Sequence, residues 1–571
     1  MMAFTGWGYP GSAFDASDKP ALWNFIERRL GLTRARPTPP IDAKTIAVPA
    51  SRLDAASAEA LRALLGAENF TTDGETRLLH SFGKSYRDLL RARRGEIGRV
   101  PDAVAFPESA AQVAEIFAVA RSRRLKVIPF GGGTNIVGGV EPSPAWDGGV
   151  LTVSLRRMNR LLALDEISQV ATLEAGALGP ELEAALNARG WTLGHFPDSF
   201  EYSTLGGWLA TRSAGMQSDA RGKIEDMVVA LTCVTPAGTI ETRAVPRGAT
   251  GPDLNQLLVG SEGIFGIITS ATMRVHRLAT REYRGLLMPD FATGVEFMQR
   301  CWREGVPPST MRLSNPEETQ LSFTLKSPGS AWSRWFSAAA KTYLRVGRGF
   351  DFERVCLMIV GWEGAAEDVA RRRDRALALA RECNAFDAGV SAGDSWFARK
   401  YEYPLLRDLI MDIGGMADVT EASVLWKDAL PVYEKVNAGL RQAVARDGVP
   451  GYIGCHLSHV YAHGVCLYFT FAAAREPGNE LAQYLRLKKL AVDLLVSSGA
   501  SLSHHHSIGY EHLPWMRDYA GAPALAAWRG VKAALDPDNL CNPGKLLPSA
   551  ESALEHYWPG WKSAAPNDNA P

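Results

Sequence analysis

Three adjacent histidines are the residues of this chain whose type and spacing most directly suggest chemistry. His504, His505 and His506 form the stretch "SLSHHHSIG" near the end of a 571-residue chain. Imidazoles bind metal ions and carry protons near neutral pH, so a metal site, a catalytic cluster and a solvated loop are all open. In an extended backbone His504 and His506 share one face and His505 lies on the other. A single metal ion bound by all three would therefore require a bent backbone.

Two further residues, a tyrosine and an arginine, have side chains that can serve in proton transfer or anion binding. Tyr468, in "GVCLYFTF", lies in an apolar run and by itself indicates a strand aromatic in the core. A phenol has a pKa near 10, so a basic role for Tyr468 would require nearby positive charge or hydrogen-bond donors. Arg407, in "LLRDL", has a planar guanidinium that suits phosphate, although such an Arg-Asp pair is commonly a surface ion pair.

A glycine-rich turn, "PFGGGTN" at residues 129–135, follows a predicted strand. Three consecutive glycines let backbone N–H groups point into a common space, and such a nest favours phosphate. The turn lacks the G-K-[ST] of a P-loop, and Ile136 stands where G-x-G-x-x-G requires its third glycine. A tight structural turn and a ligand-binding loop are both open at this point.

Two later passages favour the ligand-binding interpretation. "DSFEYSTLGGWLATRSAGM", residues 198–216, combines hydroxyl side chains with paired glycines and a segment of small residues. "GSEGIFGIITSATMRV", from Gly260 onward, places three glycines and a serine ahead of another strand. Both passages suit close approach of the backbone to a flat, polar ligand.

The chain is long enough for two or three packed units that would position these residues. From Pro101 the pattern predicts a strand, a helix that begins near Ser109, and a strand "KVIPF", which together make a β-α-β opening. Later long helices alternate with strands and predict an antiparallel sheet covered by helices. The expected parts are an N-terminal wrap (1–95), a ligand-binding domain (96–277), a cap (278–500) and a C-terminal segment that returns to the first domain (501–571).

Composition excludes several classes of protein. The 62 basic and 62 acidic residues balance, so no long-range field attracts nucleic acid or an anionic membrane. Seven scattered cysteines without a C-x-x-C pair argue against a disulfide framework and a zinc ribbon. No secretory signal, apolar spanning run or peroxisomal address is visible. We therefore expect a cytoplasmic protein without a nucleic-acid partner.

The motifs G-G-G-T-N, D-S-F-E-Y-S-T-L-G-G, G-S-E-G-I-F-G and D-P-D-N-L-C-N-P-G-K occur in the order of a known superfamily. The chain resembles flavoenzymes of the vanillyl-alcohol oxidase and p-cresol methylhydroxylase type. The resemblance implies an α+β fold with a two-part FAD-binding domain and a cap over the flavin. No histidine lies in the glycine turn, where some relatives attach flavin covalently, so we expect non-covalent FAD. The resemblance implies that these residues line the FAD: Pro129, Phe130, Gly131, Gly132, Gly133, Thr134, Asn135, Asp198, Ser199, Phe200, Glu201, Tyr202, Ser203, Thr204, Thr211, Arg212, Ser213, Ala214, Gly260, Ser261, Glu262, Gly263, Ile264, Phe265 and Gly266.

Within this superfamily the chain is similar to the alkylglycerone-phosphate synthases almost from end to end. The similarity includes "GWGYPGSAFD", "GHFPDSFEYSTLGGWLATRSAGM", "STMRLSN", "LLRDL", "GVCLYFTF" and "SLSHHHSIG". Hydroxy-acid dehydrogenases of the same fold usually carry Glu-His-Gly where this chain has its histidine run. An FAD-dependent dehydrogenase or oxidase of 2-hydroxy acids or alcohols is therefore the alternative.

The family reaction exchanges the acyl group of acylglycerone phosphate for a long-chain alcohol, through a flavin N5 adduct and with no net oxidation. The resemblance implies that Tyr468 donates and accepts the proton and that Arg407 binds the substrate phosphate. It also implies that His504, His505 and His506 are proton carriers around the reacting carbonyl, with no metal. Arg312 matches a position that the family needs, and an indirect role in ordering the cap is open. The expected partners are these lipid substrates; peripheral membrane association and a homodimer are hypotheses.

Overall fold

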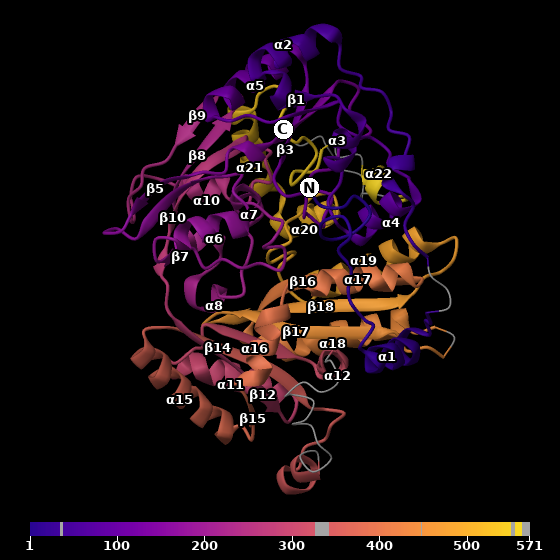
Figure 1. Ribbon diagram of the computed structural model, residues 1–571, viewed down its shortest axis with the longest axis vertical. Helices are drawn as coiled ribbons and strands as arrows, with labels where there is room; N and C mark the ends of the chain where they lie inside the picture. The colour runs from indigo at the N-terminus through magenta and orange to yellow at the C-terminus, as the bar shows by residue number, and fades with distance from the viewer. Residues whose placement is uncertain (35–37, 326–341, 447, 550–553, 562–571) are drawn as a thin grey trace.

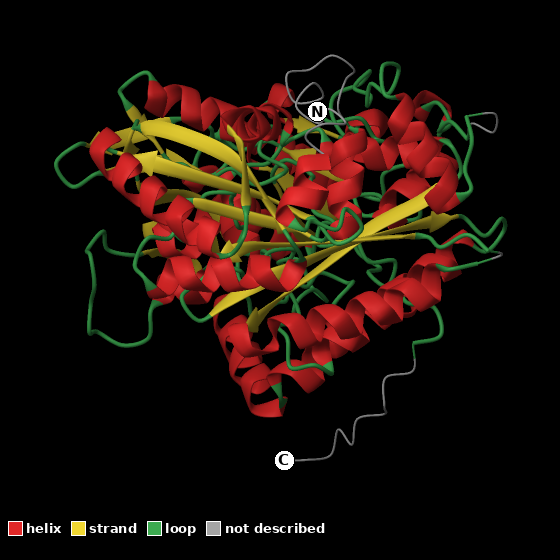
Figure 2. Cartoon of the chain, turned by 90° about the horizontal axis from the view of Figure 1, so that it is seen from below, coloured by secondary structure: helices red, strands yellow, loops and turns green. Residues whose placement is uncertain are grey.

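Three main sheets organise the residues that the structure describes, two before Arg277 and one after it. The computed structural model describes residues 1–34, 38–325, 342–446, 448–549 and 554–561. Figure 1 shows the first two sheets in the upper part of the molecule and the third in the lower part. Figure 2 shows helices on both sides of the long strands.

The first sheet has the order β1-β2-β4-β3, and its last three strands are parallel. The strands are β1 (Phe70–Thr71), β2 (Ala103–Ala105), β3 (Lys126–Phe130) and β4 (Val150–Ser154). Helix α5 (Ala110–Arg123) joins β2 to β3, and the Ser109 hydroxyl caps it by accepting a hydrogen bond from the Gln112 N–H. This is the β-α-β opening that the sequence predicts.

The second sheet is antiparallel, with the order β5-β6-β10-β8-β9. Its strands are β5 (Leu161–Asp165), β6 (Val170–Glu174), β8 (Val228–Thr235), β9 (Gly238–Glu241) and β10 (Ile267–Arg274). A small pair, β7 (Trp191–Thr192) with β11 (His276–Arg277), lies beside it. Helices α6 (Gly179–Asn187) and α7 (Leu205–Thr211) contribute to the same apolar core.

The third sheet, called the cap sheet here, has seven antiparallel strands in the order β15-β12-β14-β13-β17-β18-β16. These are β12 (Thr280–Met288), β13 (Thr310–Ser314), β14 (Cys356–Gly364), β15 (Phe386–Gly389), β16 (Gly415–Leu425), β17 (Tyr452–Val460) and β18 (Gly464–Ala474). The antiparallel sheet covered by helices is the one that the sequence predicts.

Strand β18 shows how the cap sheet presents polar residues to one side. Successive side chains of a strand point to opposite faces. Val465, Leu467, Phe469 and Phe471 lie in the buried core with α18 (Ala429–Val444) and α19 (Glu480–Val496). The opposite face of β18 therefore carries the side chains of Cys466, Tyr468, Thr470 and Ala472. That second face points toward the first two sheets.

Further helices complete the cap and connect it to the rest of the chain. They are α11 (Phe291–Arg303), α12 (Pro316–Thr324), α15 (Ala366–Glu382), α16 (Val390–Arg399) and α17 (Tyr403–Asp412). Three short helices lie between α7 and β10 in the sequence: α8 (Ser218–Arg221), α9 (Ile224–Met227) and α10 (Leu254–Leu258).

Both ends of the chain cross between the two halves. Helix α1 (Pro20–Leu30) packs against α12 and β18 of the cap (Figure 1), whereas α2 (Ala55–Leu65) packs on α5 and α4 (Tyr86–Arg94) contacts α19. The C-terminal segment contains α20 (Met516–Ala520), α21 (Ala522–Leu535) and α22 (Leu554–Tyr557) and pairs Cys541 with Val127 of β3. The domain boundaries expected at residues 95, 277 and 500 stay predictions.

Candidate active site

A cavity of about 420 Å³ lies between the glycine turn and the polar face of the cap sheet. That volume is within the usual range for a ligand site. Its walls come from the first domain, from the cap strands β13, β16, β17 and β18, and from helices α1, α12 and α17. Residues more than 400 positions apart in sequence therefore share one wall.

The residues of the first-domain wall fit a flavin nucleotide. The main-chain N–H groups of Gly132, Gly133 and Thr134 donate to no other described residue, and all three residues line the cavity. Such unpartnered N–H groups suit phosphate oxygens. The Asn542 side chain adds a buried carbonyl oxygen without a partner among the described residues. A Cβ atom on Gly132 would lie 1.7 Å from the Tyr202 carbonyl oxygen, so only glycine fits there.

Eighteen of the predicted flavin-binding residues line this cavity. They are Pro129, Phe130, Gly131, Gly132, Gly133, Thr134, Asn135, Asp198, Ser199, Ser203, Thr204, Thr211, Ser213, Ala214, Ser261, Glu262, Gly263 and Gly266. The structure does not bring the other seven to the cavity wall. These are Phe200, Glu201, Tyr202, Arg212, Gly260, Ile264 and Phe265.

Most of the seven residues pack against other parts of the protein instead of the cavity. Phe200 stacks on Tyr401 with ring centroids 5.5 Å apart, and Ile264 and Phe265 belong to the buried core. Arg212 donates to the carbonyl oxygens of Val259 and Gln256. Gly260 has a φ of +86° and lies against the Arg212 side chain. Glu201 is exposed, and the half-buried ring of Tyr202 contacts Trp7 and Tyr9.

Tyr468 lies at the centre of a row of polar residues across the cap sheet. In the strand register it is directly opposite Glu421 of β16 and His456 of β17. The three side chains therefore share the face that lines the cavity. The Tyr468 ring is nearly parallel to the His456 ring, with centroids 4.7 Å apart, and to the His505 ring, 5.9 Å away. Burial and the carboxylates of Asp198 and Glu421 raise the pKa of Tyr468 well above its ordinary value, so its phenol is protonated at neutral pH.

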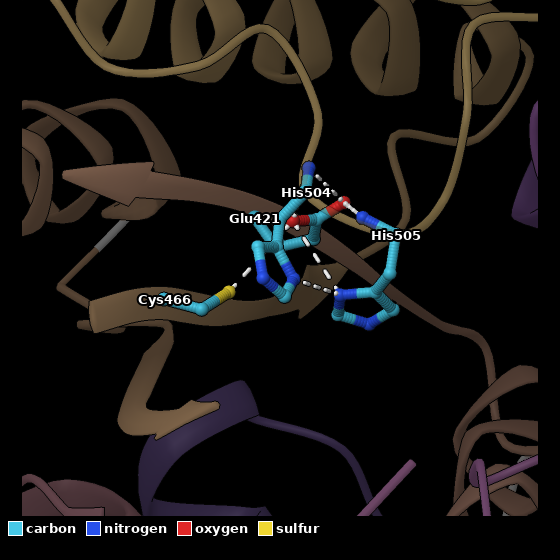
Figure 3. Close-up of side chains that lie close together, drawn as sticks. All are labelled: Glu421, Cys466, His504 and His505. Atoms are coloured by element: carbon cyan, nitrogen blue, oxygen red, sulfur yellow. Dashed lines mark hydrogen bonds and ion pairs between the residues drawn. The ribbon is translucent and has the colours of Figure 1, made fainter. Parts of the chain in front are cut away.

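The histidine run is a bent turn whose backbone is held by one carboxylate. Glu421 Oε1 accepts hydrogen bonds from the main-chain N–H groups of His504, His505 and His506 at 3.0, 3.1 and 3.0 Å. The Ser503 hydroxyl donates to the same oxygen at 2.8 Å. Burial opposes ionisation of Glu421, but the three imidazoles and these N–H groups hold its pKa well below the ordinary range. The bent backbone differs from the extended run considered in the sequence, and Figure 3 shows the side chains of His504 and His505 beside the Glu421 carboxylate.

The imidazoles of the turn form a hydrogen-bonded network. His504 Nδ1 is 2.9 Å from His505 Nδ1, and His504 Nε2 is 2.6 Å from the Tyr461 hydroxyl. His505 and His506 line the cavity, whereas His504 lies behind them. Burial lowers the pKa of all three imidazoles below the ordinary value, so they are neutral near pH 7. They therefore bring ring nitrogens that can donate or accept hydrogen bonds to this part of the site, instead of positive charge, and the rings of His505 and His506 lie beside the Tyr468 ring.

Glu421, Cys466, His504 and His505 are close enough to share a metal ion (Figure 3). Carboxylate, thiol and imidazole together are a donor set that zinc accepts. Their lone pairs are largely used already, because Glu421 accepts several N–H groups and His504 has a protein partner on each ring nitrogen. Burial and the adjacent Glu421 also raise the pKa of the Cys466 thiol well above its ordinary value. We interpret the cluster as a hydrogen-bond network.

Arg312 is connected to the site by Glu318 of α12. Its Nη2 donates to Glu318 Oε1 at 2.9 Å, and His456 Nδ1 lies 3.1 Å from the same oxygen. Burial opposes ionisation, but His456 and Arg312 together lower the pKa of Glu318 to about 2. This ion-paired group fixes the ring of His456, which stacks on Tyr468. Arg312 itself also lines the cavity.

Arg407 of α17 presents unpaired cationic donors to the cavity. Its Nη1 donates to the Lys84 carbonyl oxygen at 2.7 Å. Its Nε and Nη2 are buried and have no hydrogen-bond partner among the described residues. The nearest carboxylate, Asp408, is 3.8 Å from Nε and receives the Trp7 N–H instead. Buried donors without partners are costly, so this guanidinium is suited to an anion inside the cavity.

One part of the cavity, called the apolar arm here, is walled by hydrocarbon side chains. Its lining residues come from α1, α12, α17 and β18: Leu22, Phe25, Ile26, Leu30, Leu321, Leu406, Ile410 and Ala472. The same residues form or border one hydrophobic cluster. The N-terminal helix is thus part of the site, a role for which the Pro-rich opening of the chain gave no signal.

Sequence reasoning did not assign three residues that the structure brings to the site. They are Glu318, Glu421 and Tyr461. His456 and His459 also lie at the site without a role assigned from the sequence. His459 lies at a bulge in β17 with a φ of +51°, and its Nδ1 is 2.7 Å from the Ser218 hydroxyl. A search for polar residues at alternate positions of the apolar strands would have found Glu421 and His456.

Two families of known sequence match the two halves of the chain. A family described as FAD binding domain matches residues 101–243, and one described as FAD linked oxidases, C-terminal domain, matches residues 278–546. Together with the cavity, these matches define an FAD-dependent flavoprotein with a cap domain.

Alkyldihydroxyacetonephosphate synthases are similar over most of the chain. The protein of that name from Trypanosoma brucei brucei is 41% identical over 87% of this chain and 81% of its own length. The one from Dictyostelium discoideum is 40% identical over 93% of this chain and 88% of its own length. A solved alkyldihydroxyacetonephosphate synthase structure superposes with a TM-score of 0.83 at 35% identity, covering 95% of this chain and 98% of its own. The chain belongs to the alkyldihydroxyacetonephosphate synthase family, also called alkylglycerone-phosphate synthases.

These comparisons confirm the family, the fold class and the FAD cofactor predicted from the sequence. Among the described residues, no helix has both the length and the apolar character needed to cross a membrane.

Proposed function

We propose that this protein is an FAD-dependent alkylglycerone-phosphate synthase that exchanges the acyl group of acylglycerone phosphate for a long-chain alcohol. The observation that carries the proposal is the combination, in one cavity, of a flavin-binding wall, unpaired donors on Arg407 and an apolar arm. Arg407 suits the phosphate of the substrate, the flavin-binding wall suits its reacting carbon, and the apolar arm suits its hydrocarbon chain. The similarity to synthases of the same name supports it.

Arg407 binds the substrate phosphate in this proposal. The Nε and Nη2 atoms of one guanidinium edge are free, and that edge matches the spacing of two phosphate oxygens. The third nitrogen is fixed by the Lys84 carbonyl oxygen, which limits the rotation of the group. Binding of the phosphate would satisfy donors that are otherwise buried without partners.

Tyr468 exchanges a proton with C1 of the substrate. A flavin held by the glycine turn and its neighbours would supply the reactive ring for the chemistry at C1. The raised pKa of the Tyr468 phenol makes it a proton donor at rest, and it becomes a base only after its proton has moved to a neighbour. The neutral rings of His505 and His506 are such neighbours, because they lie beside Tyr468 with ring centroids 5.9 and 5.5 Å away. Arg312 acts indirectly, by holding Glu318 and hence His456.

The apolar arm holds the hydrocarbon chain of the acyl group and then of the alcohol. Burial of apolar surface contributes about 0.8 kcal/mol for each CH₂ group removed from water. A long chain would therefore bind far more tightly than a short one.

The test is an exchange assay on the purified protein with bound FAD. Acylglycerone phosphate and a labelled long-chain alcohol should give labelled ether product and free fatty acid in equal amounts, without lasting reduction of the flavin. The alternative, a dehydrogenase or oxidase of hydroxy acids or alcohols, predicts a flavin bleached after anaerobic mixing with such a substrate. That result without exchange would overturn the proposal.

Three further features are part of the proposal. The flavin is held non-covalently, so denaturation by acid should release all of it from the polypeptide. The protein is cytoplasmic and associates with membranes peripherally, because its substrates are lipids; co-sedimentation with phospholipid vesicles tests this. It forms a homodimer, which sedimentation equilibrium tests.

A further inference from the structure

The proposed exchange produces one proton per turnover that must leave an enclosed cavity. The acyl group departs as a carboxylate with the electron pair of its bond to C1, and the alcohol oxygen bonds to C1 and loses its proton. No electrons are gained or lost overall. A carboxylic acid has a pKa near 4, so the fatty acid is ionised at neutral pH and the alcohol proton is left over. A site walled by hydrocarbon side chains needs a route that takes this proton to water.

Two hydrogen bonds connect the cavity wall to Tyr461, a half-buried residue next to exposed residues of the β17–β18 turn. His505 lines the cavity, and its Nδ1 is 2.9 Å from His504 Nδ1. His504 Nε2 is 2.6 Å from the Tyr461 hydroxyl. Tyr461 is half-buried in the turn between β17 and β18, and the next two residues, Ala462 and His463, are exposed. The Tyr461 and His463 rings lie 6.0 Å apart.

We propose that His504 and Tyr461 form a proton exit, which carries the alcohol proton from His505 at the cavity wall to solvent at the β17–β18 turn. The inference rests on the proposed exchange reaction. His504 and Tyr461 do not line the cavity, so they act as relay residues and not as catalytic ones.

One set of tautomers makes every step of the relay possible. His505 accepts the proton at Nε2, which has no partner among the described residues, and releases its Nδ1 proton to His504 Nδ1. His504 then releases its Nε2 proton to the Tyr461 oxygen, and Tyr461 releases its own proton to water. Each imidazole accepts a proton on one ring nitrogen and releases one from the other, so the number of protons on every group is unchanged after the last step. The geometry fixes which nitrogens face each other, and only this pairing conducts outward.

The groups around His504 and His505 allow each imidazole to be protonated briefly but do not stabilise a lasting positive charge. Glu421 Oε2 is 3.7 Å from His505 Nδ1 and stabilises a transient imidazolium. Lys223 Nζ donates to the His504 carbonyl oxygen at 2.5 Å, and its positive charge opposes a lasting one. Burial lowers the pKa of both imidazoles, so each returns to the neutral form. His459, whose ring lies 5.2 Å from that of His504, is neutral for the same reason.

The test compares the holoprotein with its Tyr461→Phe variant, which keeps the ring and removes the relay oxygen. Tyr433→Phe is the matched control, because Tyr433 is a partly buried cap tyrosine that does not line the cavity. FAD content and thermal stability show whether each variant is folded. Fatty acid release is followed in the first turnover and at steady state, and proton release is followed with a pH indicator in weak buffer.

We expect the wild type and Tyr433→Phe to release one proton with each fatty acid. Tyr461→Phe should complete its first turnover at the wild-type rate. Its steady-state rate should then be roughly tenfold lower than that of the wild type, a smaller effect than the usual loss of a catalytic acid–base group. Added imidazole, a small proton carrier, should restore its steady-state rate. A variant that keeps the full steady-state rate, or that loses first and later turnovers equally, would overturn the proton exit. A wild type that releases no fatty acid at all would instead overturn the proposed function.

Proton NMR of histidine-labelled holoprotein gives a readout that does not depend on turnover. The wild type should show a far-downfield proton shared between His504 and His505, and Tyr461→Phe should shift the tautomer of His504. The His504 tautomer in Tyr461→Phe can be measured even if the variant is unstable at the assay temperature, because the spectra can be recorded at a lower temperature. An unchanged His504 spectrum in Tyr461→Phe would also overturn the relay.

Discussion

Glu421 lies directly opposite Tyr468 in the β16–β18 ladder, and its carboxylate accepts the main-chain N–H groups of the histidine turn. One buried charge thus sets the position of His505 and His506 relative to the tyrosine. Removal of that charge should affect both folding and activity.

Glu421→Gln should lower the free energy of unfolding by about 3 kcal/mol, because an amide group cannot accept all of these N–H donors and leaves some buried without partners. Exchange activity should fall as well, since His505 and His506 would lose their fixed places. Urea denaturation and the exchange assay measure the two effects. Glu434→Gln, at an exposed position on α18, should change stability by less than about 0.5 kcal/mol. Equal stability of Glu421→Gln and this control would refute the structural role.

Glu318 predicts a pH-dependent part of the stability. Its folded-state pKa of about 2 lies below the unfolded value of 4.5, so the unfolded chain takes up this proton first. The contribution, about 3 kcal/mol, is fully present above pH 4.5 and is lost as the pH falls toward 2. The difference in unfolding free energy between the wild type and Glu318→Gln should shrink over that window. A difference that stays constant with pH would show that Glu318 is not ionised by its neighbours.

Arg407→Lys tests the phosphate site. An ammonium group places one donor where the guanidinium places two, so KM for acylglycerone phosphate should rise at least about tenfold. FAD content should stay the same. Arg486→Lys, an exposed arginine paired with Glu476, is the control and should behave as the wild type. An unchanged KM in Arg407→Lys would exclude this residue as the anchor.

Ala472→Leu tests the apolar arm. Ala472 of β18 lines the cavity, and a larger side chain there would shorten the space for hydrocarbon. The preferred alcohol should become shorter, with kcat/KM for the longest chains reduced roughly tenfold relative to a chain a few carbons shorter. Competition between alcohols of two lengths measures this ratio. Ala527→Leu, on an exposed face of α21, should leave the ratio unchanged, and an unchanged ratio in Ala472→Leu would mean that the chain binds elsewhere.

The sequence predicted the elements whose ends carry local signals. Ser109 caps α5, a glycine turn ends β3, and α15 has clear helical periodicity, so these elements lie where expected. Helix α1 was not placed at the cavity, because its contact with the cap depends on how distant parts of the chain meet. The seven flavin-loop residues that lie away from the cavity belong to the same segments as residues that line it, and the resemblance gave only continuous segments.

The candidate site was predicted in part for a similar reason. The run of three histidines stands out in the sequence itself, whereas the roles of Tyr468 and Arg407 were implied only by the family resemblance. Glu421 is a single acidic residue in "ADVTEASVL", and only the strand register places it opposite Tyr468. The position of Tyr461 beside His504 likewise results from the fold of a turn against a distant segment.

The exchange assay on Tyr468→Phe tests the central claim most directly. The variant keeps the ring stacking and loses only the hydroxyl that faces the reaction, so FAD content and stability should match the wild type. The account predicts that ether formation and fatty acid release fall together by at least about a hundredfold, the usual scale for an acid–base group. Tyr468→Phe with full exchange activity would contradict it.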